Sequence, residues 1–131
     1  MVAPDMLKKG RGSIMITAST GAFAGSETLG TYNISKLADI ALVRNLAMEW
    51  GPKGVRVNAI CPGLIKTDFA KALWDNPEAA QRVTEQTPLR RFGESEDFEG
   101  IVVYLASDAS AYMTGQALTI CGGTHMYRLP N

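Results

Sequence analysis

Three short apolar runs are spaced along the chain and have the composition of buried β-strands. They cover residues 13–18, 55–61 and 116–121, and they are rich in isoleucine, valine, leucine and alanine. Glycine or proline stands beside each run. Apolar runs of this length with such boundaries are typical of strands that are buried on both faces of a parallel sheet.

The segment between the first two runs has the pattern of a long helix. It covers residues 29–50 and is followed by Gly51 and Pro52, which commonly end helices. Apolar residues occur around its whole circumference, so we expect two buried faces. One face would cover the sheet, and the other would contact a further partner, for which a second subunit is the natural candidate.

Shorter helices are predicted after the second run. Residues 65–86 indicate helical pieces that are interrupted at Asn76 and Pro77. A last helix is expected over residues 95–106, with Ser95 as its N-cap and with acidic residues in its first turn.

Strands that alternate with helices in this order predict an α/β fold, a Rossmann-like parallel sheet with flanking helices and right-handed crossovers. About three strands are expected, so the sheet is thin. We expect the first strand to lie at an edge with unpaired backbone groups. No internal repeat or low-complexity linker divides the chain, and residues 1–131 are therefore treated as one unit.

Composition narrows the classes of function. Thirteen basic and thirteen acidic side chains cancel, which argues against nucleic acid and anionic membrane surfaces as partners. No apolar stretch approaches the ~20 residues that span a bilayer, and no signal-peptide pattern is present. Cys61, Cys121 and the single histidine, His125, lack the spacing of metal ligands. We expect a soluble, cytoplasmic protein that acts on a small molecule without a metal.

Three polar residues are the main candidates for chemistry. Tyr32 and Lys36 are four residues apart in the predicted helix, so the ammonium group can lie beside the phenol. A neighbouring positive charge favours the phenolate, which a tyrosine acid or base requires. Ser19 follows the first strand, at the edge where open α/β sheets bind ligands. On spacing alone, however, such a Tyr-Lys pair is more often an ordinary surface pair.

The wider sequence context favours the functional interpretation. The chain carries S-T-G-A-F-A-G-S-E-T-L-G-T-Y-N-I-S-K, then V-R-V-N-A-I-C-P-G-L-I-K-T, and finally Y-M-T-G-Q-A-L-T-I-C-G-G. In this order, these segments resemble the short-chain dehydrogenase/reductase family. The resemblance implies hydride transfer between NADP or NAD and a carbonyl or secondary alcohol. It further implies that Ser19 holds the substrate oxygen, Tyr32 transfers the proton, and Lys36 binds the nicotinamide ribose.

The same resemblance assigns further site residues in and after the second strand. The cofactor would contact Tyr32, Lys36, Pro62, Gly63, Ile65 and Thr67. The substrate would contact Ser19, Leu64 and Phe69, the last two within a lid over residues 64–88. Without the Tyr-Lys pair, the Pro-Gly pair would be read as an ordinary turn. The apolar lid residues have near-helical spacing, so a place in the core remains an equal alternative for each of them.

The resemblance covers nearly the whole chain but only half of such a protein. The glycine-rich phosphate loop of the family is absent. Thr20, Gly21 and Gly25 imitate its start, but Glu27 stands at the last glycine position and would repel phosphates. We therefore expect residues 1–131 to be the carboxyl-terminal catalytic half, with the dinucleotide-binding first half absent. The resemblance also implies a homodimer or homotetramer for the full-length parent.

Two hypotheses of different classes remain open on the sequence. In the first, the chain belongs to an oxidoreductase, and L-I-K-T-D-F-A-K-A-L-W with C-G-G-T most resembles carbonyl reductases. In the second, it is a non-catalytic fragment that acts only as a folding or interaction module. A reductase of enoyl thioesters is less favoured, because that branch usually separates its tyrosine and lysine by more than three residues. NAD and NADP are not distinguished, because the part that reads the adenosine ribose is absent.

Overall fold

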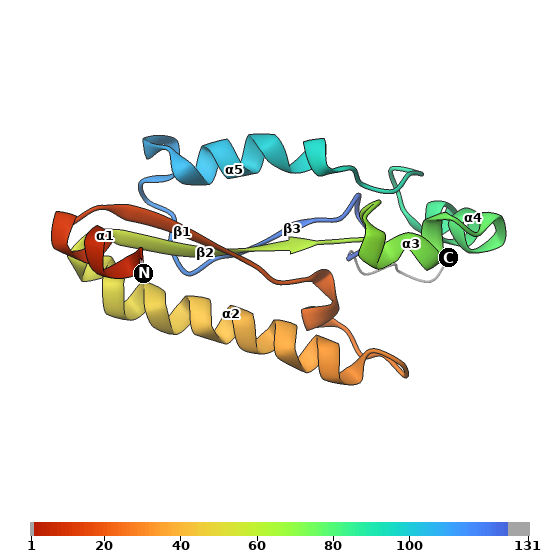
Figure 1. The fold of residues 1–131 in the computed structure, drawn as a ribbon, viewed down its shortest axis with the longest axis horizontal. Coiled ribbons are helices and arrows are strands. Elements are labelled where there is room, and N and C mark those ends of the chain that lie inside the picture. The colour runs from red at the N-terminus through yellow and green to blue at the C-terminus, as the bar shows by residue number, and fades with distance from the viewer. Residues whose placement is uncertain (1, 126–131) are drawn as a thin grey trace, which may run out of the picture.

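A single parallel sheet of three strands forms the centre of the computed structural model, which describes residues 2–125 (Figure 1). The strands are β1 (Gly12–Thr17), β2 (Val55–Pro62) and β3 (Ala117–Ile120), in the order β1-β2-β3. Each corresponds to one of the apolar runs. The predicted α/β class, with about three strands, is confirmed.

Helices cover both faces of this sheet. Figure 1 shows α2 (Gly30–Trp50) along one face and α5 (Glu99–Ala106) along the other. The segment between β2 and α5 contains α3 (Lys71–Trp74) and α4 (Pro77–Gln86), which confirms the predicted break between helical pieces. They lie beyond the carboxyl end of β2 in the same view. One α-helix was not predicted, the short helix α1 (Ala3–Lys9).

The register of the sheet brings the carboxyl ends of the strands to one edge. β1 pairs with β2 from Gly12 opposite Val55 to Thr17 opposite Ile60. β3 pairs only with the last part of β2, ending with Ile120 opposite Pro62. Because all three strands run in parallel, the residues that follow them in sequence gather at the same edge.

The core lies between α2 and β2. Ile40, Val43 and Ala47 of α2 are buried together with Val55 and Val57 of β2. This set explains why β2 has a nearly continuous apolar sequence: it is the central strand, covered on both faces.

Only one of the two expected faces of α2 is buried. The other carries exposed apolar side chains, among them Ile34, with 71% of its surface exposed, and Met48, with 81%. β1 is likewise paired on one side only within residues 2–125. The prediction that the first strand lies at an edge is confirmed.

The predicted N-cap of the last helix is wrong. A 3₁₀ turn, Ser95–Phe98, precedes α5, and the capping residue is Glu94 rather than Ser95. The side chain of Glu94 accepts from the backbone N–H of Asp97, and Asp97 accepts from the N–H of Glu94 in return. This reciprocal pair satisfies two N–H groups at once, which a lone serine hydroxyl does not.

Candidate active site

A cavity of about 810 Å³ opens at the carboxyl edge of the sheet. It lies between the end of β1, the first turn of α2, and the segment that follows β2. Its walls are mostly apolar, and none of the described residues that line it carries a charge. The lining includes eight of the nine site residues expected from the sequence, namely Ser19, Tyr32, Pro62, Gly63, Leu64, Ile65, Thr67 and Phe69.

Ser19 sits directly after β1 in extended backbone, with φ −165° and ψ 154°. It caps the 3₁₀ turn Thr20–Phe23, and its Oγ accepts from the N–H of Gly21 at 3.1 Å. The backbone N–H of Ser19 also points at the buried thiol of Cys61; burial raises the pKa of this thiol, and the N–H opposes that effect. Ser19 is therefore held by its own turn and by the neighbouring strand.

Tyr32 and Lys36 lie one turn apart on α2, as their spacing predicts. The Nζ atom of Lys36 is 5.9 Å from the centroid of the Tyr32 ring. The Tyr32 ring also stacks on Phe69, with centroids 6.0 Å apart and the planes at 29°. The tyrosine therefore has both a cation and an aromatic ring as neighbours, and it lines the cavity.

Lys36 is the one expected site residue that does not line the cavity. Its ammonium group donates to the backbone carbonyl of Thr17 at 3.0 Å and forms an ion pair with Asp39 at 3.0 Å. Both contacts hold the side chain at the end of β1. The structure therefore brings the ammonium beside the tyrosine but not into the cavity.

The segment after β2 is fixed against both neighbouring strands. The N–H of Gly63 donates to the carbonyl of Ile120 at 3.0 Å. A Cβ at Gly63 would lie only 2.7 Å from the Cβ of Cys121. The hydroxyl of Thr20 donates to the carbonyl of Pro62 at 3.1 Å. A glycine is required here because Cys121, directly after β3, approaches too closely for a side chain.

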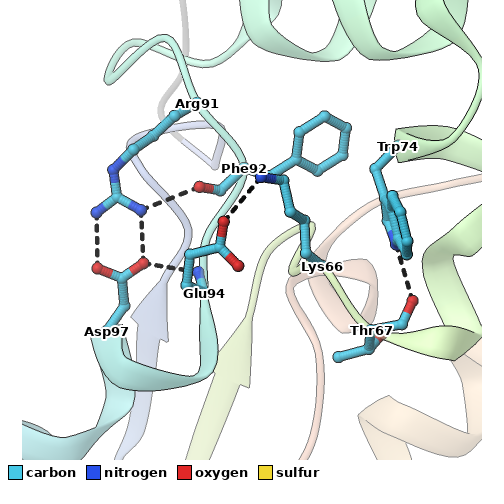
Figure 2. A network of polar contacts seen from close by, with 7 residues as sticks. All are labelled: Lys66, Thr67, Trp74, Arg91, Phe92, Glu94 and Asp97. Carbon is cyan, nitrogen blue, oxygen red and sulfur yellow. Dashed lines mark hydrogen bonds and ion pairs between the residues drawn. The ribbon is translucent and has the colours of Figure 1, made fainter.

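A second set of contacts, which we call the clasp, holds the segment 64–67 to the segment 91–97 (Figure 2). Two backbone bonds join the segments: Lys66 N–H to Gly93 O at 2.9 Å, and Gly93 N–H to Leu64 O at 3.0 Å. Lys66 pairs with Glu94 at 2.9 Å. The clasp therefore fixes the part of the cavity wall that Leu64, Ile65 and Thr67 provide.

The fork between Arg91 and Asp97 stabilises the clasp. Two guanidinium nitrogens of Arg91 bind the two carboxylate oxygens of Asp97 at 2.6 Å each (Figure 2). The Arg91 side chain, together with the N–H of Glu94, holds the pKa of Asp97 far below its usual range. The carboxylate therefore stays charged, and its contacts stay intact, at any pH at which the protein is expected to work.

The indole of Trp74 fixes the start of the lid. Its Nε1–H donates to the carbonyl of Thr67 at 2.9 Å (Figure 2). This bond connects α3 to one of the residues expected at the cofactor. Three apolar lid residues that line the cavity, Phe69, Ala70 and Leu73, lie between Thr67 and Trp74 in the sequence.

Several cavity residues were missed by the sequence reasoning. Asn33 follows Tyr32 directly; its Nδ2 donates to Ala24 O at 3.0 Å, whereas its buried Oδ1 has no partner among the described residues. Phe98 and Val102, at the start of α5, also line the cavity. No local pattern identifies the last two, because they reach the cavity only through the crossing of α5 over the sheet.

No helix within residues 2–125 is long and apolar enough to cross a bilayer. In the same part of the chain, no group of three or more histidine, cysteine or acidic side chains lies close enough to hold a metal ion.

The fold and the site together define a Rossmann-like type of α/β protein, with a serine, a tyrosine and a lysine at the carboxyl edge of a parallel sheet. A family model described as enoyl-(acyl carrier protein) reductase matches residues 1–125. Dehydrogenase/reductase SDR family member 4 from Sus scrofa is 43% identical over 123 residues, which are 94% of this chain and 44% of that protein. The chain belongs to the short-chain dehydrogenase/reductase family.

Solved structures give the same result. A short-chain type dehydrogenase/reductase from Mycobacterium ulcerans superposes with a TM-score of 0.90 at 36% identity, over 98% of this chain and 47% of that one. A gluconate 5-dehydrogenase from Burkholderia cenocepacia, in complex with NADP and tartrate, gives 0.90 at 29% identity, over 94% and 48%. A 7α-hydroxysteroid dehydrogenase, complexed with NADH and 7-oxo glycochenodeoxycholic acid, gives 0.87 at 40%, over 93% and 48%. The chain spans about half the length of the proteins it matches.

Proposed function

We propose that the chain forms the catalytic part of an oxidoreductase that transfers a hydride between NAD(P)(H) and a carbonyl or secondary alcohol. The observation that carries this proposal is the meeting of Ser19 and Tyr32 in one cavity, with the Lys36 ammonium beside the tyrosine ring. Spacing alone left the Tyr-Lys pair ambiguous. Family membership and the position of the pair at the carboxyl edge of the sheet both support the catalytic interpretation.

The cavity fits the nicotinamide end of such a cofactor. Its volume lies within the range of small-molecule sites, and its uncharged lining suits a nicotinamide ring and its ribose rather than a pyrophosphate. We assign the contacts inside the cavity to Tyr32, Pro62, Gly63, Ile65 and Thr67. Lys36, which lies beside Tyr32 but outside the cavity lining, is assigned a contact with the nicotinamide ribose. NADP and NADH are the cofactors of the two complexed neighbours described above, and either suits this proposal.

The residues of the chain divide the remaining work of the reaction. When bound, the nicotinamide supplies or takes the hydride at the substrate carbon. The hydroxyl of Ser19 holds and polarises the substrate oxygen. Tyr32 gives a proton to that oxygen in reduction and takes it back in oxidation, while the charge of Lys36 favours the ionised phenol.

The substrate site is apolar beside this polar centre. Leu64 and Phe69 lie in the cavity wall, and both are substantially exposed, at 40% and 82%. An exposed aromatic ring stacked on the catalytic tyrosine offers a flat apolar surface to a ligand. An uncharged ketone or aldehyde suits this lining, and we propose a carbonyl reductase type of activity.

Two surfaces that are unpartnered within residues 2–125 support an active protein that contains further polypeptide. The unpaired side of β1 and the exposed face of α2 are the places where further polypeptide would dock. We propose that the dinucleotide-binding half is supplied by a longer parent polypeptide or by another chain, in a cytoplasmic homodimer or homotetramer. The same surfaces support the second candidate, a fragment that acts only as an interaction module.

Calorimetric titration with NADPH and NADH distinguishes these two candidates. It should be run on the 131-residue chain and on the product of the complete reading frame, with light scattering to give the oligomeric state. Micromolar binding by the longer protein, with reduction of a carbonyl substrate that requires Tyr32, supports the oxidoreductase. Absence of binding and activity in both proteins supports the interaction module.

A further inference from the structure

Asp39 shares the ammonium group of Lys36 with the end of β1. The Lys36 Nζ atom lies 3.0 Å from Asp39 Oδ2 and 3.0 Å from the carbonyl of Thr17. Only 25% of the Lys36 side chain and 32% of the Asp39 side chain are exposed. The ion pair is therefore shielded more than most surface pairs, and its electrostatic effect is less screened by solvent.

The three residues Tyr32, Lys36 and Asp39 form one stripe along α2. Their spacing, i, i+4 and i+7, places them on the same face of the helix. Tyr32 lines the cavity, whereas Asp39 does not. Asp39 can thus affect the reaction through Lys36 but has no contact with the cavity of its own.

We propose that Asp39 is a positioning residue for the hydride-transfer reaction, which holds the Lys36 ammonium at the end of β1 and offsets its charge beside Tyr32. The inference rests on the proposed function, because it assigns to Asp39 a role in the proton transfer by Tyr32. An orienting group behind the cation restricts its rotamers, so that the charge is in place before substrate binds.

No other described charge competes for this position in the elements that pack most closely on α2. β1 and the turn Thr20–Phe23 contain no charged residue. The single charged residue of β2, Arg56, binds the carbonyls of Leu105 and Ser107. Lys53, in the turn after α2, lies at the far end of that helix. On α2 itself, Arg44 and Glu49 are the remaining charges, and both are exposed.

The test compares Asp39→Asn with wild type in the protein made from its complete reading frame. Alcohol oxidation requires the ionised Tyr32, so the kcat/KM of this reaction rises with pH. Removing the carboxylate leaves the Lys36 charge unopposed, and the rise should move to lower pH by about 0.5 unit. The looser lysine should lower kcat by roughly three- to tenfold, with KM for the carbonyl substrate little changed.

Two further variants make the result specific. Glu49→Gln removes a negative charge from the same helix, ten residues and about 15 Å away, and should leave the profile in place. Asp39→Glu keeps the charge and should restore the wild-type midpoint. If Asp39→Asn does not fold, Asp39→Ser replaces it, because this variant also removes the carboxylate; a purely structural aspartate would lower its melting temperature and leave its pH profile and kcat unchanged.

An Asp39→Asn profile that coincides with wild type, in a protein whose activity is lost in Tyr32→Phe and in Lys36→Ala, overturns the role of Asp39 alone. Activity that survives in Tyr32→Phe overturns the proposed function instead. The two failures are thus distinguished by the same set of variants.

Discussion

At the amino end of the sheet, polar side chains bind the protein itself, whereas at the carboxyl end several of them face a cavity. Arg56, near the start of β2, donates to the hydroxyl of Ser110 and to the carbonyls of Leu105 and Ser107 at 2.8 to 3.1 Å. At the other end, Tyr32 lines open space, and the buried Oδ1 of Asn33 has no partner in the described chain.

This difference separates residues that maintain the fold from residues left available for a ligand. Buried polar groups are normally satisfied, because an unsatisfied one costs free energy. The amino end follows this rule. The carboxyl end departs from it, and it also exposes Leu29, Leu64 and Phe69 near the same cavity. Such departures from local stability are expected where a protein binds its ligand.

The largest effect on this comparison is expected from Tyr32→Phe. The variant removes the proton-transferring hydroxyl, so activity should fall by about 10²- to 10⁴-fold. Folding should be unaffected, since no hydrogen bond of that hydroxyl contributes to the structure of residues 2–125. Steady-state kinetics and thermal melting measure the two effects. The matched control is Tyr112→Phe, at a fully exposed tyrosine, and equal activity of the two variants would contradict the assignment.

At the opposite end, Arg56→Met should affect stability rather than chemistry. It keeps the aliphatic stem but removes the charged donor from two carbonyls and a hydroxyl, so the free energy of unfolding should fall by about 2 kcal/mol. Urea denaturation gives this value, with Arg44→Met at an exposed position of α2 as the control. Unchanged stability together with lost cofactor binding would reverse the comparison.

Gly63→Ala should affect both stability and binding, because the residue lies at the cavity and against β3. The new Cβ would meet the Cβ of Cys121 at 2.7 Å, so the two strand ends must separate, at a cost of about 1–2 kcal/mol. Affinity for NAD(P)H should decrease in parallel. Gly25→Ala adds the same methyl group where nothing lies within 4 Å and should be neutral in both measurements.

The smallest effect separates the two cysteines. Burial raises the pKa of Cys61; at Cys121 burial acts in the same direction, but N–H groups of residues 123–125 and the Thr124 hydroxyl outweigh it and lower the pKa. Cys121 should therefore react several-fold faster with iodoacetamide at pH 7.5, because the thiolate is the reacting form. Peptide mapping by mass spectrometry identifies the labelled residue. Preferential labelling of Cys61 would show that the core under Ser19 opens readily.

The raised pKa of Cys61 also predicts how the stability of the protein changes at alkaline pH. A thiol whose pKa is raised in the folded protein stays protonated after its unfolded counterpart ionises. Its contribution is therefore complete below about pH 9 and is lost as pH rises above that value. Cys61→Ala should reduce this alkaline loss, which denaturation at pH 8 and pH 10 measures.

The elements of the fold could be predicted from local sequence, since each depends on neighbours in the chain. The three apolar runs and the glycines beside them are sufficient for the strands. The N-cap was mispredicted because Gly93-Glu94-Ser95-Glu96-Asp97 offers two capping patterns, and the choice between them depends on Arg91 binding Asp97. α1 was missed because seven residues carry too little periodicity for a prediction.

The candidate site could be predicted only where a motif describes it. Ser19, Tyr32 and Pro62 belong to such motifs, and the structure places all three at one cavity. The clasp joins residues about thirty positions apart, and no local pattern specifies which backbone groups pair. Asp39, by contrast, is three residues from Lys36, and helical spacing alone could have pointed to that ion pair.

The bond between the Trp74 indole and the Thr67 carbonyl gives the protein a natural fluorescent reporter. Indole emission responds to the loss of a hydrogen bond and to a nearby reduced nicotinamide, so events at the cavity can be followed without a label. Trp50 is half-buried against the core at the end of α2 and provides an internal reference. In a Trp50→Phe variant, Trp74 would be the single source of tryptophan fluorescence. The change of this fluorescence with time would measure how fast the lid responds to a ligand.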